Sequence, residues 1–275
     1  MENLIYPGSY PDDETVRELI IPEGVIEITD GAFRDFANIE CVTVPKSVKR
    51  IGASAFSGCK RLREVRLSFG LTEIADEAFS SCPALGGITL PDSVSYIGEG
   101  AFEGCAALSS VKLSERLESI GASAFAYCFN LGGIEIPDSC DSIEMCAFLC
   151  CFSLEWVKIS NNVSMLSEST FEGCRSLKEA DLPTKLFKIS GRCFKGCSSL
   201  VSVILPVGVR YIGLDAFADC SSLSRIALPK DLEEYFAYLA EWKKMWKGAC
   251  INSFGICDIL CAIYCFAMRY VACAT

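Results

Sequence analysis

The sequence predicts a solenoid of the α/β repeat type, rich in short strands, in which a parallel sheet and single helical turns are stacked and a C-terminal α-helix caps the end. Three observations predict it: a fixed 23-residue period, one apolar pattern shared by the repeats, and a change of pattern after the last repeat. A fixed period of this length indicates one supersecondary unit per repeat, which buries its apolar face only against its neighbours. Nine phenylalanines carry the period without insertion or deletion: Phe33, Phe56, Phe79, Phe102, Phe125, Phe148, Phe171, Phe194 and Phe217.

Each repeat contains the same apolar skeleton. In it, Leu-x-x-Val-x-Leu ends in period-two alternation and contains β-branched residues, which indicates a short strand. A proline without an N–H then ends the pairing in many repeats. These prolines are Pro45, Pro91, Pro137, Pro183, Pro206 and Pro229. A second short extended segment, Val-x-x-Ile-Gly, leads into Ala-Phe-x-x-Cys, which we expect to form a single helical turn.

The full pattern, Leu-x-x-Val-x-Leu-Pro-x-x-Val-x-x-Ile-Gly-x-x-Ala-Phe-x-x-Cys, resembles the BspA-like class of leucine-rich repeats over roughly residues 16 to 232. The resemblance implies a parallel-stranded horseshoe or gently curved leucine-rich-repeat solenoid. It also implies adhesion or other protein contacts, because many members are bacterial or protist surface proteins. Such members usually carry export signals, whereas residues 1–11 have no basic n-region and no apolar h-region. We therefore expect a cytoplasmic location, with the cell surface as the alternative.

Four segments are expected: a lead-in at 1–15, a solenoid of about nine units at 16–230, a capping helix at 231–248 and an apolar, cysteine-rich tail at 249–275. Asp231 is a suitable N-cap, apolar residues follow at helical spacing, and an amphipathic helix would cover the last rung. A partner-binding helix is the alternative. The apolar run at 259–268 is too short to span a bilayer, which needs about 20 residues. Its cysteines could pack on the cap, lie in a dimer, or be lipidated near a membrane.

Eight of the 18 cysteines form one column of the solenoid, three residues after a phenylalanine. Its members are Cys59, Cys82, Cys105, Cys128, Cys151, Cys174, Cys197 and Cys220, and Phe36 takes their place in the first unit. Parallel strands repeat about every 4.8 Å, whereas a disulfide needs Cβ atoms about 3.8 Å apart, so these cysteines are expected to be small buried hydrophobes. A metal or redox ladder is the alternative. The sequence contains no Cys-x-x-Cys and no His, so we expect no metal site.

Composition restricts the possible functions. The net charge of −10 and the absence of a basic patch argue against a nucleic-acid partner. Without His, triads lack the usual base, and no nucleophile elbow or Gly-rich phosphate loop replaces it. We therefore expect no enzyme and no cofactor. A hydrolase or metal protein remains an alternative, since some carboxylates will lie close together by chance.

The outward positions of the first strand, eighth and tenth after each phenylalanine, can vary without disturbing the core and are therefore candidates for a binding surface. We predict a non-enzymatic scaffold that binds a protein or peptide there, with a cell-surface adhesin as the alternative. The predicted partner-binding residues are Trp156, Lys158, Ile204, Glu135 and Asp181. Two purely structural alternatives stay open. Trp156 could stack on its rung neighbours, and Lys112, Glu135, Lys158 and Asp181, which alternate in sign, could satisfy one another.

Overall fold

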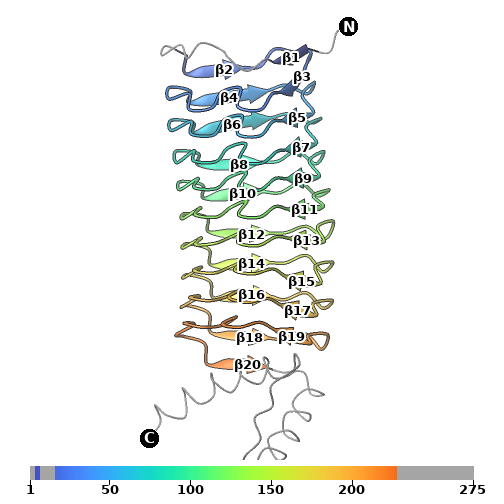
Figure 1. Cartoon of the computed structure of the whole chain (residues 1–275), viewed down its shortest axis with the longest axis vertical. Coiled ribbons are helices and arrows are strands. Elements are labelled where there is room, and N and C mark those ends of the chain that lie inside the picture. The colour runs from blue at the N-terminus through green and yellow to red at the C-terminus, as the bar shows by residue number, and fades with distance from the viewer. Residues whose placement is uncertain (1–3, 7–15, 228–275) are drawn as a thin grey trace, which may run out of the picture.

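The computed structural model describes residues 4–6 and 16–227 and shows a column of stacked rungs (Figure 1). Each rung contributes two short strands, and each strand pairs in parallel with its equivalent on a neighbouring rung, 23 residues away except between β1 and β3, where the offset is 21 to 22 residues. The predicted leucine-rich-repeat solenoid with a parallel sheet is therefore confirmed.

The strands form two ladders. The first ladder consists of two hydrogen-bonded sheets, interrupted between β13 and β15. One contains β1 (Leu4–Tyr6), β3 (Val25–Ile28), β5 (Arg50–Ile51), β7 (Glu73–Ile74), β9 (Tyr96–Ile97), β11 (Ser119–Ile120) and β13 (Ser142–Ile143), and the other contains β15 (Met165–Leu166), β17 (Lys188–Ile189) and β19 (Tyr211–Ile212). The second ladder contains β2 (Glu18–Ile20), β4 (Cys41–Val44), β6 (Glu64–Leu67), β8 (Gly87–Thr89), β10 (Ser110–Lys112), β12 (Gly133–Glu135), β14 (Trp156–Lys158), β16 (Glu179–Asp181), β18 (Ser202–Ile204) and β20 (Arg225–Ala227). Its hydrogen bonding is interrupted between β6 and β8, between β10 and β12, and between β16 and β18.

The nine phenylalanines of the period form a continuous aromatic stack inside the column. Successive ring centroids lie 5.2 to 5.5 Å apart, with interplanar angles of 2 to 16°. All nine rings are buried, and they belong to one hydrophobic cluster that extends from Leu19 to Leu223. Offset stacking of this kind adds to the stabilisation that burial provides. The repeated Phe is therefore the centre of the core.

The cysteine column lies beside this stack and is buried, with every thiol free of a disulfide. The predicted packing role is confirmed. The structure also shows why a thiol suits the position. Each Sγ donates a weak hydrogen bond to the main-chain carbonyl of the phenylalanine in the preceding rung, at 3.0 to 3.2 Å. A cysteine therefore fills an apolar space and provides a buried carbonyl with a second donor.

The segment Ala-Phe-x-x-Cys is not a helical turn, and that prediction is wrong. The residues two before and two after each phenylalanine all have positive φ, between 52 and 77° for all eighteen of them. Alternate N–H groups therefore point along the column, as when Phe56 N donates to Ala78 O of the next rung at 2.8 Å. The N–H groups between them close tight turns within the rung, as from Ala55 N to Gly52 O at 3.2 Å. Neighbouring rungs are thus joined here by a hydrogen-bonded ladder of turns.

Left-handed residues other than glycine carry a steric cost in these turns. Arg192, with φ of 55°, is exposed, and Arg192→Gly is expected to stabilise the protein by about 0.5 to 1 kcal/mol. Lys195→Gly in the same turn is the matched control. The φ angle of Lys195 is not positive, so Lys195→Gly should lower the free energy of unfolding by about as much as Arg192→Gly raises it. Urea midpoints of the two variants test this, and two shifts of the same sign would contradict it.

Several predictions concern other parts of the chain. The capping helix at 231–248 and the tail at 249–275 lie outside the described residues. Within the lead-in, Leu4–Tyr6 forms β1 and pairs with β3. No helix long and apolar enough to cross a membrane occurs in residues 4–6 and 16–227.

Candidate binding face

The outward side chains of the second ladder form a surface that we call the strand face. On it, β12, β14 and β16 lie side by side in register, with Glu135 opposite Lys158 and Lys158 opposite Asp181. Lys158 Nζ donates to Glu135 Oε1, and this carboxylate raises the pKa of the ammonium group. Three of the predicted residues are thus brought together, and two of them form an exposed ion pair. Such pairs contribute little to stability, so they can be rearranged when a partner binds.

Trp156 lies at the register position next to Gly133, and its indole folds over that glycine. A Cβ at position 133 would collide with Cε2, Nε1 and Cζ2 of the ring. The indole nevertheless remains 49% exposed. The sequence left open whether Trp156 stacks on its rung neighbours or is exposed for binding. Both hold: one part of the indole packs on the neighbouring rung, and the other part is accessible to a partner.

Ile204, the fifth predicted residue, lies apart from this group. It is 75% exposed on β18, beyond β16 and across an interruption of the ladder. Within the described part of the chain it lines neither of the hollows that adjoin Trp156 and Lys112. The sequence placed it correctly on the outward side, but the structure does not bring it to Trp156.

Two shallow hollows adjoin each other on the strand face and share Ser110, Val111 and Lys112. Hollow 1, of about 310 Å³, lies over β10 and β12 and is closed at one end by Trp156. Hollow 2, of about 520 Å³, lies over β6, β8 and β10. Together they form a groove that runs along the column from Glu64 to Trp156.

The two hollows are the same feature repeated after 46 residues, or two rungs. Gly87, Ile88, Thr89 and Pro91 in hollow 2 correspond to Gly133, Ile134, Glu135 and Pro137 in hollow 1. Each hollow also contains an interruption of the second ladder, between β6 and β8 or between β10 and β12. The signal that sequence reasoning missed is the pair of glycines that introduces each of these strands: Gly86 with Gly87, and Gly132 with Gly133.

Charges in the groove are unevenly compensated. Arg66 is held by both carboxylate oxygens of Glu64, at 2.8 and 3.0 Å, and Glu135 is paired with Lys158. Lys112, which lines both hollows, has no ion-pair partner among the described residues. Glu115, which lines hollow 1, also has no ion-pair partner among the described residues, so the groove holds one unpaired charge of each sign, and the positive one lies where the two hollows meet.

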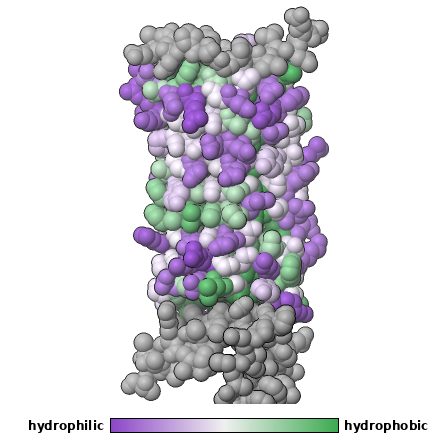
Figure 2. Space-filling view, in the orientation of Figure 1, coloured by the Kyte–Doolittle hydropathy of each residue, from purple (hydrophilic) through white to green (hydrophobic). Residues whose placement is uncertain are grey.

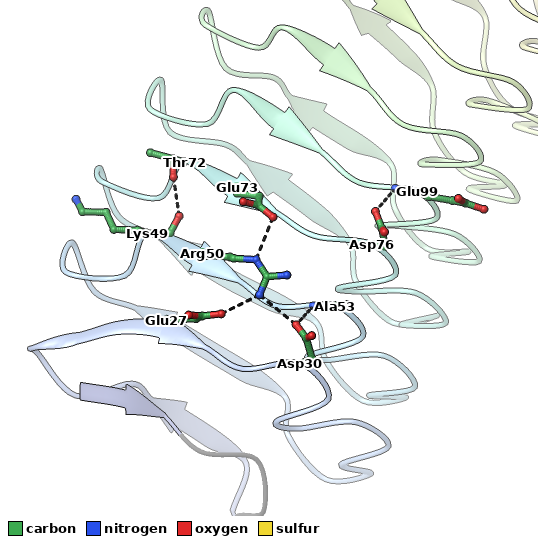
Figure 3. Close-up of polar contacts among 9 residues, drawn as sticks. All are labelled: Glu27, Asp30, Lys49, Arg50, Ala53, Thr72, Glu73, Asp76 and Glu99. Carbon is green, nitrogen blue, oxygen red and sulfur yellow. Dashed lines mark hydrogen bonds and ion pairs between the residues drawn. The ribbon is translucent and has the colours of Figure 1, made fainter. Parts of the chain in front are cut away.

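On the first ladder, the outward charged side chains near the N-terminal end form ion pairs with one another (Figure 3). Arg50 donates to Glu27 at 2.8 Å, to Glu73 at 3.0 Å and to Asp30 at 3.1 Å. Asp30 also accepts a hydrogen bond from Ala53 N at 2.7 Å. That N–H, together with the Arg50 guanidinium, holds the pKa of the Asp30 carboxyl below its usual value. This network joins rungs and leaves little free bonding capacity for a ligand.

A separate aromatic pair, the exposed Phe129 and the partly exposed Phe152, lies in the turns of neighbouring rungs. The rings of Phe129 and Phe152 stack 4.9 Å apart, and Arg175 lies 4.5 Å from the Phe152 centroid. Figure 2 shows one side of the column, where hydrophilic side chains predominate and hydrophobic ones gather in a band near the middle. Among the described residues, no group of three or more His, Cys, Asp or Glu side chains is placed to hold a metal ion.

Comparisons with known proteins agree with this architecture. The model of the BspA type leucine rich repeat region matches residues 26–151 and 118–240. The structure of a leucine rich repeat protein from T. pallidum has 26% sequence identity, with 85% of each chain covered and a TM-score of 0.49. The pneumococcal vaccine antigen PcpA has 21% identity and a TM-score of 0.50, with 78% of this chain and 60% of PcpA covered.

A further structure, titled a leucine rich cell surface protein, comes from Faecalibacterium prausnitzii and has 21% identity, with 86% of this chain and 92% of that chain covered and a TM-score of 0.36. No curated protein matches the chain. The expected cytoplasmic location finds no support in these comparisons. With the family model covering most of its length, the chain belongs to the BspA-type leucine-rich-repeat family.

Proposed function

We propose that the protein is a non-enzymatic scaffold that binds a protein or peptide on its strand face, with Trp156 as the main anchor. The observation that supports this most directly is the position of the indole. It is fixed against Gly133, half exposed, and forms one end of a hollow. A rigid aromatic side chain loses little conformational entropy on binding, and Trp is enriched among residues that dominate interface energies.

The neighbouring charges have the arrangement of an interface rim. Glu135, Lys158 and Asp181 surround the Trp156 strand and are exposed, so they can steer a partner and fix its register. Ile204, two rungs away, is a second apolar contact for a partner long enough to reach β18. The adhesin alternative uses the same face with a partner outside the cell, and membership of the BspA-type family supports it.

Trp156→Ala is expected to weaken binding of a protein partner by about 2 kcal/mol or more, because the anchor's contact area is lost. A partner recovered with the intact chain would be purified and its affinity measured by calorimetry. Folding should change by less than about 1 kcal/mol, since the side chain points away from the core.

Met165→Ala is the matched control. Met165 is also an exposed apolar residue, 40% exposed, but it lies on β15 of the first ladder. It should leave the affinity unchanged. Binding that survives Trp156→Ala but is lost when residues 249–275 are deleted would place the binding site in the tail and contradict the proposal.

A further inference from the structure

The groove formed by hollows 1 and 2 has a repeat distance that selects a ligand conformation. The hollows are two rungs apart, which is about 9.5 Å at the usual strand spacing. The phenylalanine rings behind them, at 5.4 and 5.3 Å per rung, give a distance of about 11 Å. If one ligand places a side chain in each hollow, these two side chains must lie about this distance apart and both point toward the groove.

A polyproline II segment meets this condition. It has three residues per turn and rises about 3.1 Å per residue, so side chains three apart face the same way at about 9.3 Å. In an extended strand, side chains on one face are about 6.7 Å apart at the second residue and about 13 Å apart at the fourth. In an α-helix, side chains seven residues apart face the same way at about 10.5 Å, which also matches the distance between the hollows. Spacing alone therefore does not exclude a helical ligand.

The main chain of the groove distinguishes the helix from the polyproline II segment. Leu90 N and Ile136 N each donate to the carbonyl of the next strand at 2.9 Å. Leu113 N holds the equivalent position in hollow 1, and within residues 4–6 and 16–227 it has no such acceptor because the ladder is interrupted there. A donor of this kind is free to bond to a carbonyl of the ligand in place of water. A polyproline II main chain has free carbonyls, whereas those of a helix are already bonded internally.

Charge and shape define the ligand further. Lys112 lies where the hollows meet and is not paired with any described carboxylate, so it is complementary to an acidic residue between the two anchors. Trp156 offers the exposed part of its ring as an apolar wall of hollow 1, which suits docking of such segments on aromatic surfaces.

We infer that the groove binds a polyproline II peptide segment that runs along the column, with apolar side chains three residues apart in hollows 2 and 1 and an acidic residue between them at Lys112. This inference rests on the proposed function and specifies the kind of partner segment that the strand face recognises.

Fluorescence anisotropy of the full chain with labelled nine-residue peptides tests it. The reference probe has a proline background, two leucines three residues apart and one glutamate between them. Matched probes place the leucines two or four apart, or replace the glutamate by lysine, and a longer alanine-based probe of about 20 residues, which forms a helix, carries leucines seven apart. The reference probe should bind at least tenfold more tightly than each of the others. Equal affinity across the spacings, or preference for the helix, would overturn the inference.

Variants locate the site. Gly87→Val fills hollow 2 at a strand position where the Cβ would lie 2.9 Å from the movable Ser110 hydroxyl and 3.4 Å from the Ser110 carbonyl oxygen, and Lys112→Glu reverses the central charge. Each should weaken the reference probe at least tenfold while leaving the melting temperature nearly unchanged. Two control variants should change the affinity for the reference probe less than twofold. They are Ser202→Val, at the equivalent strand position outside both hollows, and Lys60→Glu, outside the groove.

The inference and the proposed function fail in different ways. If no probe binds selectively but a protein partner still depends on Trp156, the groove inference is wrong and the scaffold function stands. If the partner does not depend on Trp156, the proposed function is wrong whatever the peptides do. Selective peptide binding that is insensitive to Gly87→Val would also overturn the groove as the site.

Discussion

Phe125→Ala is expected to lower the free energy of unfolding by about 3 to 5 kcal/mol, the usual cost of emptying a buried aromatic site. The ring is fully buried and stacks on Phe102 at 5.3 Å and on Phe148 at 5.5 Å, so the substitution removes two aromatic contacts as well as buried area. Each rung contacts only its neighbours, so unfolding should also become less cooperative around this position. Chemical denaturation followed by circular dichroism would measure both effects.

The matched control is the same substitution at an exposed phenylalanine. Phe187 is 48% exposed, and Phe187→Ala should cost less than about 1 kcal/mol. A loss below about 1 kcal/mol at Phe125 would show that the aromatic stack is not what holds the rungs together.

The cysteine column is expected to make the free energy of unfolding fall at alkaline pH. Burial raises the pKa of the Cys128 and Cys220 thiols to about 12 and that of Cys105, Cys151, Cys174 and Cys197 well above the usual value of 9.0. Folded thiols therefore stay protonated while unfolded ones ionise above about pH 9. Because the folded state then holds more protons, the contribution of these thiols to stability is constant below this pH and decreases as the pH rises toward the folded pKa.

The expected effect is large because it is repeated along the column. With an unfolded pKa near 9, one such thiol lowers the free energy of unfolding by about 1 kcal/mol between pH 9 and 10, so three of them would lower it by about 3 kcal/mol. Guanidinium midpoints from pH 7 to 10 under reducing conditions would show the decrease. In Cys128→Ala, the free energy of unfolding should decrease less steeply above pH 9, by the contribution of one thiol. This holds even if the variant is less stable than the original protein at pH 7. A midpoint that stays constant up to pH 10 would contradict burial of the column.

Much of the fold could be predicted because its repeated positions are chemically uniform. The Phe and Cys columns and the alternation Leu-x-x-Val-x-Leu identify what is buried in each rung, and all of these predictions are confirmed. The turn was predicted wrongly because Ala-Phe-x-x-Cys has the apolar spacing of a helix. The positive φ angles fall on residues as different as Ser54, Glu77 and Arg192, whose side chains do not reveal them. Only the glycines at six of these eighteen positions gave a hint.

The candidate site was predictable in position but not in shape. Period-two alternation placed Trp156, Lys158 and Ile204 outward, and the structure agrees. The direction in which an indole leans depends on the space beside it, which Gly133 provides from the neighbouring rung. The hollows depend on where the ladder loses its hydrogen bonds, a property of two rungs together. A single repeat, however carefully aligned, does not contain that information.

The hollows repeat every second rung, whereas the aromatic stack and the thiols repeat every rung, and this difference affects how the protein can evolve. Duplication of 23 residues preserves every core contact, because these contacts join neighbouring rungs at constant offsets. Duplication of a 46-residue pair that includes Gly87 or Gly133 would in addition create a third hollow in line with the first two. Such a duplication would therefore lengthen the groove by two rungs at a time. A lineage can fit a longer partner by copying such a pair, with no new surface residues to select.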